Sequence, residues 1–245
     1  CTDKTGTLTQ NKIILERLLD IGGNDDDRVL RHAYLNSYYQ TGFKNLIDVA
    51  VLEHGDGSSL AHLGTMYEKV DEIPFDFSRR RMSVVLRDAS GKTQMVTKGA
   101  VEEMLSISSH AEYKGEVIAL TPAIRSEILN TVERLNSDGM RVVAVAQKNN
   151  PTPVRGFSVL DESDMVLMGY VAFLDPPKET APAAISAFRD HGVTVKVITG
   201  DNEVIAAHVC KRVGLPVQGA LLGSEVDSMG DAQLDALVAQ ALQNN

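Results

Sequence analysis

The spacing of apolar side chains changes along the chain and predicts two kinds of sheet. Residues 83–87 and 93–97 are β-branched or apolar runs on either side of a polar loop with one glycine, residues 88–92, which predicts an antiparallel hairpin. Further on, a threonine and Pro122 form a helix start, the next isoleucine, valine and leucine side chains fall on one helical face, and Gly139 ends the helix. We therefore expect antiparallel strands in the middle of the chain.

The last third has a different order of elements. Residues 165–174 predict a buried strand, residues 180–191 a helix and residues 193–199 a second buried strand. A strand, a helix and a strand in succession are the building block of a parallel sheet. We therefore expect a parallel domain that is split in the sequence by an inserted, largely antiparallel domain.

Composition narrows the class of protein. The 245 residues are 43% hydrophobic and 23% charged, as in soluble globular proteins, and the length favours two domains. No run reaches the roughly 18 apolar residues of a membrane-spanning helix, and a formal charge of -9 argues against a nucleic-acid partner. Two cysteines are too few for a disulfide framework, which favours the reducing cytosol. Because the start resembles neither an initiator methionine nor a signal sequence, we expect a fragment of a larger protein.

Residues 3–9, with the sequence DKTGTLT, carry the strongest chemical signal. An aspartate such as Asp3 can attack the terminal phosphorus of ATP and hold it as an acyl phosphate. The heptapeptide resembles the phosphorylation motif of P-type ATPases, and the alternative is an ordinary strand-to-turn segment. Related haloacid-dehalogenase-type phosphatases place an acid where this chain has Thr5, and a threonine cannot do that acid–base work. We therefore expect a phosphoenzyme that persists.

A second part of the same site is expected at Thr199-Gly200-Asp201. These residues follow an apolar run and precede a helical pattern at 203–212, where backbone amides bind phosphate oxygens well. The family resemblance implies that Thr199 and Gly200 contact the transferred phosphate and that Asp201 completes the nucleotide and magnesium environment. A capped turn is the alternative. The resemblance thus gives a catalytic set of Asp3, Thr5, Thr199, Gly200 and Asp201.

Asp175-Pro176-Pro177-Lys178 resembles the Asp-Pro-Pro-Arg hinge of the same family, and a plain rigid linker is the alternative. Lysine lacks the bidentate fork of arginine, which weakens the case that Lys178 contacts phosphate. Asp175 is therefore the candidate from this segment for contact with the nucleotide.

Magnesium is the metal that the resemblance implies. Its expected ligands are the Asp3 carboxylate and the Thr5 carbonyl, with a further ligand from a later Gly-Asp-Gly-x-x-Asn-Asp segment of the family that this sequence does not contain. We therefore expect this chain by itself to bind ATP but to turn it over poorly.

A nucleotide pocket is inferred from the inserted domain. The segment 74–83 (PFDFSRRRMS) pairs aromatic rings with cations, a combination that stacks adenine and offsets phosphate charge. Counting back from Met82, the family resemblance places the stacking ring at Phe75, with Phe77 second and Arg80 among the cations. Alternatively, both phenylalanines are core residues and the arginines a solvated edge.

Three further segments resemble parts of the family's nucleotide cleft. Lys98 would line the cleft, and Gly99 would let the backbone approach the base. Arg141 would reach the phosphates, or it could be an ordinary surface cation. Asp48 would accept from the adenine amino group, or it could belong to a helix surface.

Residues 38–45, 75–84 and 174–180 look most like bacterial magnesium-transporting P-type ATPases. The resemblance implies an α/β fold: an incomplete, split haloacid-dehalogenase-like (Rossmann-like, parallel) phosphorylation domain at residues 1–9 and 175–245, with an inserted α+β nucleotide-binding domain on an antiparallel sheet at 10–174. It also implies ATP as substrate, Mg2+ as cofactor, the cytoplasmic face of the inner membrane as location, transmembrane and actuator domains of the same parent protein as partners, and a monomeric fragment.

Two other functions stay open from the sequence. One is a soluble phosphatase of the haloacid dehalogenase type with a large cap, against which Thr5 argues. The other is a nucleotide-binding module without catalysis of its own.

Overall fold

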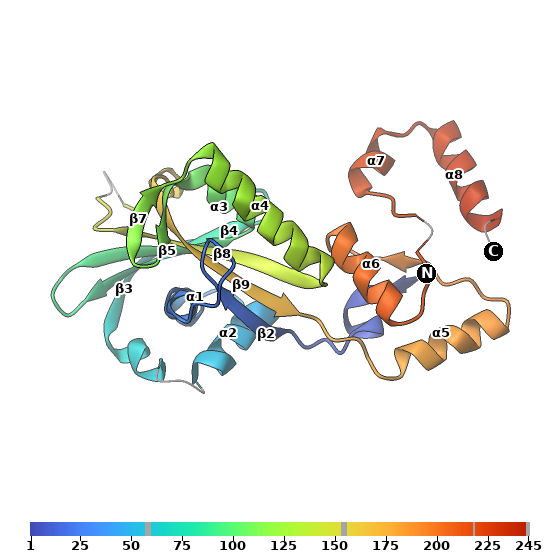
Figure 1. The fold of residues 1–245 in the computed structure, drawn as a ribbon, viewed down its shortest axis with the longest axis horizontal. Coiled ribbons are helices and arrows are strands. Elements are labelled where there is room, and N and C mark those ends of the chain that lie inside the picture. The colour runs from blue at the N-terminus through green and yellow to red at the C-terminus, as the bar shows by residue number, and fades with distance from the viewer. Residues whose placement is uncertain (57–59, 153–155, 218, 244–245) are drawn as a thin grey trace. The chain divides into compact units, whose positions relative to one another are not determined.

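The chain divides into two compact units, which are described separately (Figure 1). The computed structural model describes residues 1–56, 60–152, 156–217 and 219–243, with side chains in the last segment as far as residue 239. Unit 1 consists of Cys1–Lys12 and Asp175–Asn245, and unit 2 of Ile13–Leu174. Unit 1 contains a parallel strand pair and unit 2 a larger, mainly antiparallel sheet, so the predicted α/β class with two kinds of sheet is confirmed.

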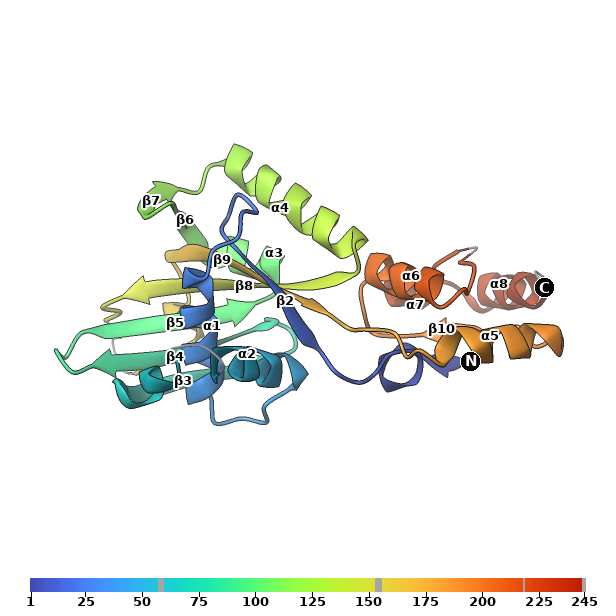
Figure 2. The same cartoon turned by 60° about the horizontal axis from the view of Figure 1, so that its bottom comes forward.

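An eight-stranded sheet forms the centre of unit 2. Its strand order is β3-β4-β5-β8-β9-β6-β7, and β2 also pairs with β9. All neighbours run antiparallel except β6 and β9, and Figure 2 shows β3, β4 and β5 side by side. The strands are β2 (Ile14–Leu19), β3 (Tyr67–Asp76), β4 (Arg81–Asp88), β5 (Thr93–Gly99), β6 (Ser108–Tyr113), β7 (Glu116–Ala119), β8 (Met140–Asn149) and β9 (Met165–Leu174).

Helices cover both faces of this sheet. On one face lie α1 (Arg28–Tyr39), α2 (Leu46–Asp56) and the short η2 (Ala61–Thr65); on the other lie α3 (Val101–Ile107) and α4 (Pro122–Ser137) (Figure 1). Because side chains alternate along a strand, β4 sends Val84 into the core under α1 and α2 and Val85 into the core under α3 and α4. Both faces of the central strands are therefore buried.

Local sequence signals predicted two of these elements well. The hairpin of β4 and β5 is confirmed, and its turn is closed by Asp88, whose carboxylate accepts from the Ser90 and Lys92 amides at 2.9 and 3.0 Å. Helix α4 begins as predicted, with the Thr121 hydroxyl accepting from a first-turn amide at 3.3 Å, and Gly139 follows its end with a φ of 82°.

The pairing predicted for the last third is wrong in two respects. Strand β9 exists, but it pairs with β2, β6 and β8 in unit 2 and not with a parallel strand of unit 1. Because helices cover both faces of β9, its sequence is a continuous apolar run. A strand in a parallel sheet has the same pattern, so the sequence does not tell the two apart. Of residues 193–199, only β10 (Val197–Ile198) is a strand, and Val193 and Ile198 are 49% and 66% exposed. Among the described residues its strand neighbour is the two-residue β1 (Thr2–Asp3), too small a sheet to bury them.

Unit 1 surrounds this short parallel pair with helices. Thr2 lies opposite Val197, and a tight turn, η1 (Lys4–Leu8), follows β1. The helix predicted at residues 180–191 is confirmed as α5, and a small core gathers Leu8 and apolar side chains of the following segments. None of the helices in the described ranges is long and apolar enough to cross a membrane. The helices of the unit are α5 (Ala181–Asp190), α6 (Glu203–Arg212), α7 (Gly223–Ser228) and α8 (Asp231–Gln243).

Candidate functional site

The candidate phosphorylation site lies where β1 and β10 end in unit 1. Asp3 pairs with Ile198 in parallel register, so the chain leaves both strands at the same edge, the usual place for a ligand in an open α/β sheet. The Nζ atom of Lys4 lies 2.7 Å from Oδ2 of Asp201 and 2.7 Å from Oδ2 of Asp175. The fold thus brings together three segments that are far apart in the sequence.

Lys4 and its two acidic partners form a buried charge cluster. Lys4 is 1% exposed, and the side chains of Asp175 and Asp201 are 15% and 6% exposed. Buried carboxylates are tolerated when a cation and hydrogen bonds compensate them. The Oδ1 atom of Asp175 is buried and has no hydrogen-bond partner among the described residues. The cluster therefore pairs one positive with two negative side chains and keeps one carboxylate oxygen able to accept a donor.

The loop of the DKTGTLT motif is fixed by its own backbone and by the hinge segment. Oδ1 of Asp3 accepts from the Lys4 amide at 2.7 Å, and the Thr9 amide donates to the Lys4 carbonyl at 3.2 Å. Gly6 has a φ of 75°, which suits a glycine. Lys178 donates its Nζ to the Gly6 carbonyl at 2.6 Å. In this structure Lys178 therefore stabilises the motif loop, while the Asp3 side chain is exposed to solvent.

The segment Thr199-Gly200-Asp201 lies directly before the N-terminus of α6. The Thr199 hydroxyl accepts from the Asp201 amide at 3.2 Å, and Asn202 caps the helix. A Cβ at Gly200 would meet no atom within 4 Å, so its backbone is open to a ligand.

The predicted magnesium ligands Asp3 and Thr5 both lie on the exposed side of the motif loop. Within residues 1–56, 60–152, 156–217 and 219–243, no group of three or more histidine, cysteine or acidic side chains could hold a metal. Magnesium usually takes one or two protein carboxylates and completes its shell with water and phosphate oxygens. An exposed carboxylate beside an open loop fits a magnesium ion that arrives with a phosphate, and the ligand assignment stays a prediction.

The predicted nucleotide residues of unit 2 converge at one end of the sheet. Met82 of β4 pairs with Lys98 of β5, and Arg81 pairs with Gly99. Gly99 in turn pairs with Ala144 of β8, three residues after Arg141. The turn between β3 and β4 lies at the same end, and it carries Phe77 and Arg80, with Phe75 at the close of β3.

Lys98 and Asp48 form an ion pair beneath α1 and α2. The Lys98 ammonium contacts Oδ1 of Asp48 and donates to Ser37 at 2.8 Å. Asp48 is 1% exposed, so its placement on a helix surface is wrong. Burial lowers the pKa of Lys98 below its usual value, against the opposite influence of the Asp48 charge. The second oxygen of Asp48 accepts from the Asn45 amide at 3.2 Å.

Phe75 and Phe77 are both available to a ligand. Their rings meet edge to face with centroids 5.3 Å apart, and they are 52% and 90% exposed, so their placement in the core is wrong. Arg80 is exposed and pairs with Glu103 at 2.8 Å. Met82 is buried. At Gly99 a Cβ would lie 2.5 Å from the Cβ of Arg81, so the neighbouring strand already requires a glycine there.

Sequence reasoning missed three residues that support these sites: Lys4, Ser37 and Glu162. Lys4 lies in the motif, but nothing in the pattern predicted its two partners. Glu162, which binds two arginines, lies in an ordinary polar run, and its partners are about 80 positions away.

We expect Lys98→Met to destabilise unit 2 by about 3 kcal/mol, because it leaves the buried Asp48 carboxylate without its cation. Urea unfolding followed by circular dichroism measures this change. The double variant Asp48→Asn/Lys98→Met should recover much of the loss. A Lys98→Met variant as stable as the wild type would contradict the prediction.

The chain belongs to the P-type ATPases, because the sequence model described as "P-type ATPase, cytoplasmic domain N" matches residues 23–180. It is 49% identical over 234 residues to "Magnesium-transporting ATPase, P-type 1" of Escherichia coli, covering 96% of this chain and 26% of that protein. The protein of the same name in Salmonella typhimurium is 47% identical over 240 residues, 98% of this chain and 27% of that protein. A calcium-transporting ATPase of Listeria monocytogenes is 30% identical over 262 residues, 96% of this chain and 29% of its own length. The chain thus spans about a quarter of the length of these relatives, and the family resemblance inferred from the motifs is confirmed.

Proposed function

We propose that this chain is the cytoplasmic ATP-binding and phosphorylation region of a magnesium-transporting P-type ATPase. The observation that carries the proposal is Asp3 at the shared edge of β1 and β10, beside the 199–201 loop, in a chain 49% identical to a magnesium transporter. Unit 1 is then the phosphorylation domain and unit 2 the nucleotide-binding domain. The parent protein lies in the inner membrane, with this region on the cytoplasmic face and transmembrane and actuator domains as its partners.

In unit 1 the Asp3 carboxylate attacks the terminal phosphorus of ATP, the bond to the ADP oxygen breaks, and an acyl phosphate forms. Mg2+ held by Asp3 and Thr5 would supply charge neutralisation for the phosphoryl oxygens. Thr199 and Gly200 bind those oxygens. Asp201 and Asp175 orient the buried Lys4, which directly follows the nucleophile Asp3 in the sequence.

Unit 2 holds the nucleotide. Phe75 stacks on the adenine, and Phe77, packed edge-on against it, covers the ring from the side. Asp48 accepts from the adenine amino group, with its carboxylate oriented by Lys98 and Ser37. Arg80 and Arg141, both exposed, offset the phosphate charge. Because Thr5 cannot act as a general acid, a soluble phosphatase is the poorer explanation of the same motif.

Calorimetric titration of ATP, ADP and AMP into this chain tests the nucleotide assignment. We expect all three to bind and Phe75→Ala to raise each Kd about tenfold, the loss of one base–aromatic stack. Phe188→Ala is the matched control, because that ring lies on α5 and is 50% exposed against 52% for Phe75. Failure of the folded wild type to bind any of the three would refute the assignment of unit 2.

A further inference from the structure

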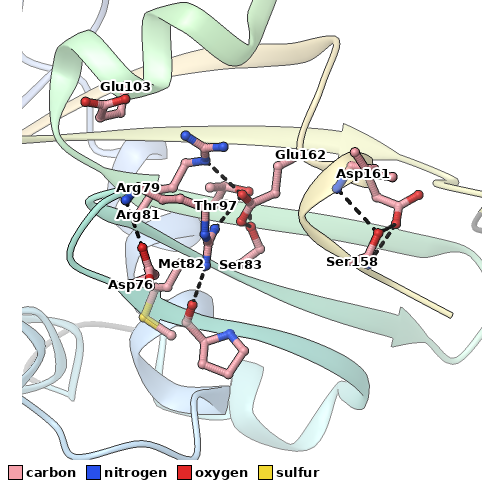
Figure 3. Close-up of polar contacts among 12 residues, drawn as sticks. Asp76, Arg79, Arg81, Met82, Ser83, Thr97, Glu103, Ser158, Asp161 and Glu162 are labelled. Atoms are coloured by element: carbon pink, nitrogen blue, oxygen red, sulfur yellow. Dashed lines mark hydrogen bonds and ion pairs between the residues drawn. The ribbon is translucent and has the colours of Figure 1, made fainter.

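A buried glutamate lies behind the turn that carries the exposed phenylalanines. Glu162 follows the short helix η3 (Val159–Asp161), and its side chain is 0% exposed. Ser158 and Asp161 cap this helix reciprocally (Figure 3). Lys148 of β8 donates to the Ser163 carbonyl at 2.9 Å. The segment that supplies Glu162 is therefore fixed on both sides of the glutamate.

The Glu162 carboxylate contacts strand β4 and the turn that precedes it. Arg79 and Arg81 both donate to the same oxygen, Oε2, at 2.7 and 2.8 Å, and Figure 3 shows the two guanidinium groups turned toward Glu162. The other oxygen accepts from Ser83 at 2.7 Å, and Ser83 shares a hydrogen bond of 2.7 Å with Thr97. A buried carboxylate with two guanidinium partners and a hydroxyl is fully compensated, and such charge-assisted bonds are stronger than neutral ones.

Arg79 extends this contact to the residue before the stacking ring. Its Nη2 donates to the Pro74 carbonyl at 2.7 Å, and Pro74 directly precedes Phe75. The planar fork of Arg79 thus joins Glu162 to the end of β3, a geometry that lysine cannot reproduce.

The turn between Phe75 and Arg81 needs such support. Arg80 has a φ of 45°, a left-handed conformation that is unfavourable for a residue other than glycine. Its amide donates to the Asp76 carbonyl at 2.7 Å, and its carbonyl accepts from the Ala100 amide at 3.0 Å. The strained residue is therefore held from within the turn by the backbone and from outside by the arginines on either side of it.

We propose that Glu162 is a positioning residue of the nucleotide site: it binds Arg79 and Arg81 and thereby fixes the turn that presents Phe75 and Phe77. This proposal rests on the proposed nucleotide-binding function of unit 2. Arg79 and Arg81 pair with Glu162 and are partly buried, whereas Arg80 is exposed and pairs with Glu103.

The test compares Glu162→Gln with Glu112→Gln. Glu112 is matched in chemistry: it is 8% exposed and pairs with Arg28 at 3.2 Å, but it lies on β6, away from β3, β4 and β5 in the sheet order. Because the sequence contains no tryptophan, Phe75→Trp adds a single fluorescent reporter at the stacking position.

We expect Glu162→Gln to raise the Kd values of ATP, ADP and AMP by the same factor, about tenfold, because all three share the adenine stack. In the Phe75→Trp background it should also lower the fluorescence anisotropy of the free protein. Glu112→Gln should change neither. Arg79→Lys keeps the charge but loses the bridge to Pro74, so it should reproduce both effects and serves where Glu162→Gln does not fold.

The outcomes separate the two claims. A wild type that binds no nucleotide refutes the function of unit 2 and with it this proposal. Wild-type binding with unchanged affinity and anisotropy in the variants refutes the role of Glu162 alone. A loss that is large for ATP and absent for AMP also refutes it, because the glutamate would then act on phosphate charge and not on the stacking ring.

Discussion

Replacing Asp3 with asparagine in the full-length protein should abolish the phosphoenzyme while leaving ATP affinity unchanged. The amide has no anionic oxygen to attack phosphorus, and the exposed Asp3 side chain contributes only one hydrogen bond to the motif loop, to the Lys4 amide at 2.7 Å. An asparagine oxygen can keep that bond. We therefore expect a loss of at least about 100-fold in phosphorylation with little loss of stability.

The measurement is the acid-stable incorporation of 32P from labelled ATP, followed by release with hydroxylamine, which cleaves acyl phosphates. Asp190→Asn is the control, because Asp190 is an exposed aspartate at the end of α5 in the same unit. Labelling of the Asp3→Asn protein at the wild-type level would show that another residue receives the phosphoryl group.

Elements with strong local signals were predictable from the sequence. The hairpin of β4 and β5 has a polar turn whose Asp88 closes on its own backbone, and α4 has a capping threonine, a proline and a terminating glycine. In both, the interactions that set the element join residues a few positions apart. Such short-range interactions can be recognised from a short stretch of sequence alone.

Strand pairing was less predictable, because it depends on distant segments. The apolar run of β9 indicates a strand with two covered faces, but either a parallel or an antiparallel sheet could cover them. The antiparallel pairing of β9 is set by β8, the strand before it, and by β2, which lies far before it in the chain. The exposure of residues 193–199 was unpredictable for the same reason, because it depends on the strands that pair with β10.

In the candidate sites, too, the contacts between distant segments were not predictable from the sequence. The motif and its resemblance indicated Asp3, Asp201 and Asp175, and Lys98 and Asp48 were indicated separately. Neither the buried Lys4 that pairs with Asp175 and Asp201 nor the direct contact of Lys98 with Asp48 was predicted. Both are ion pairs between residues far apart in the sequence, and a single sequence does not indicate which distant residues pair.

These buried pairs imply that parts of each site hold one another in place before a ligand arrives. In unit 1, the Lys4 ammonium, next to Asp3 in the chain, pairs with two carboxylates. Such pairs contribute less to stability than to geometry when both partners are present, and their loss is expensive when only one is removed. We therefore expect removal of the lysine to be severe for unit 1.

Lys4→Met should destabilise unit 1 by about 5 kcal/mol, because it leaves Asp175 and Asp201 buried without their common cation. Hydrogen exchange with mass spectrometry measures the effect, since amides of α5 and α6 should exchange much faster while those of the β4–β5 hairpin in unit 2 serve as an internal control. Adding Asp201→Asn to Lys4→Met should restore part of the protection, as one of the two carboxylates that lost Lys4 is then neutral. Unchanged exchange in α5 and α6 of the Lys4→Met protein would mean that the cluster does not hold unit 1 together, and Lys4 would then have to be explained by chemistry at Asp3 alone.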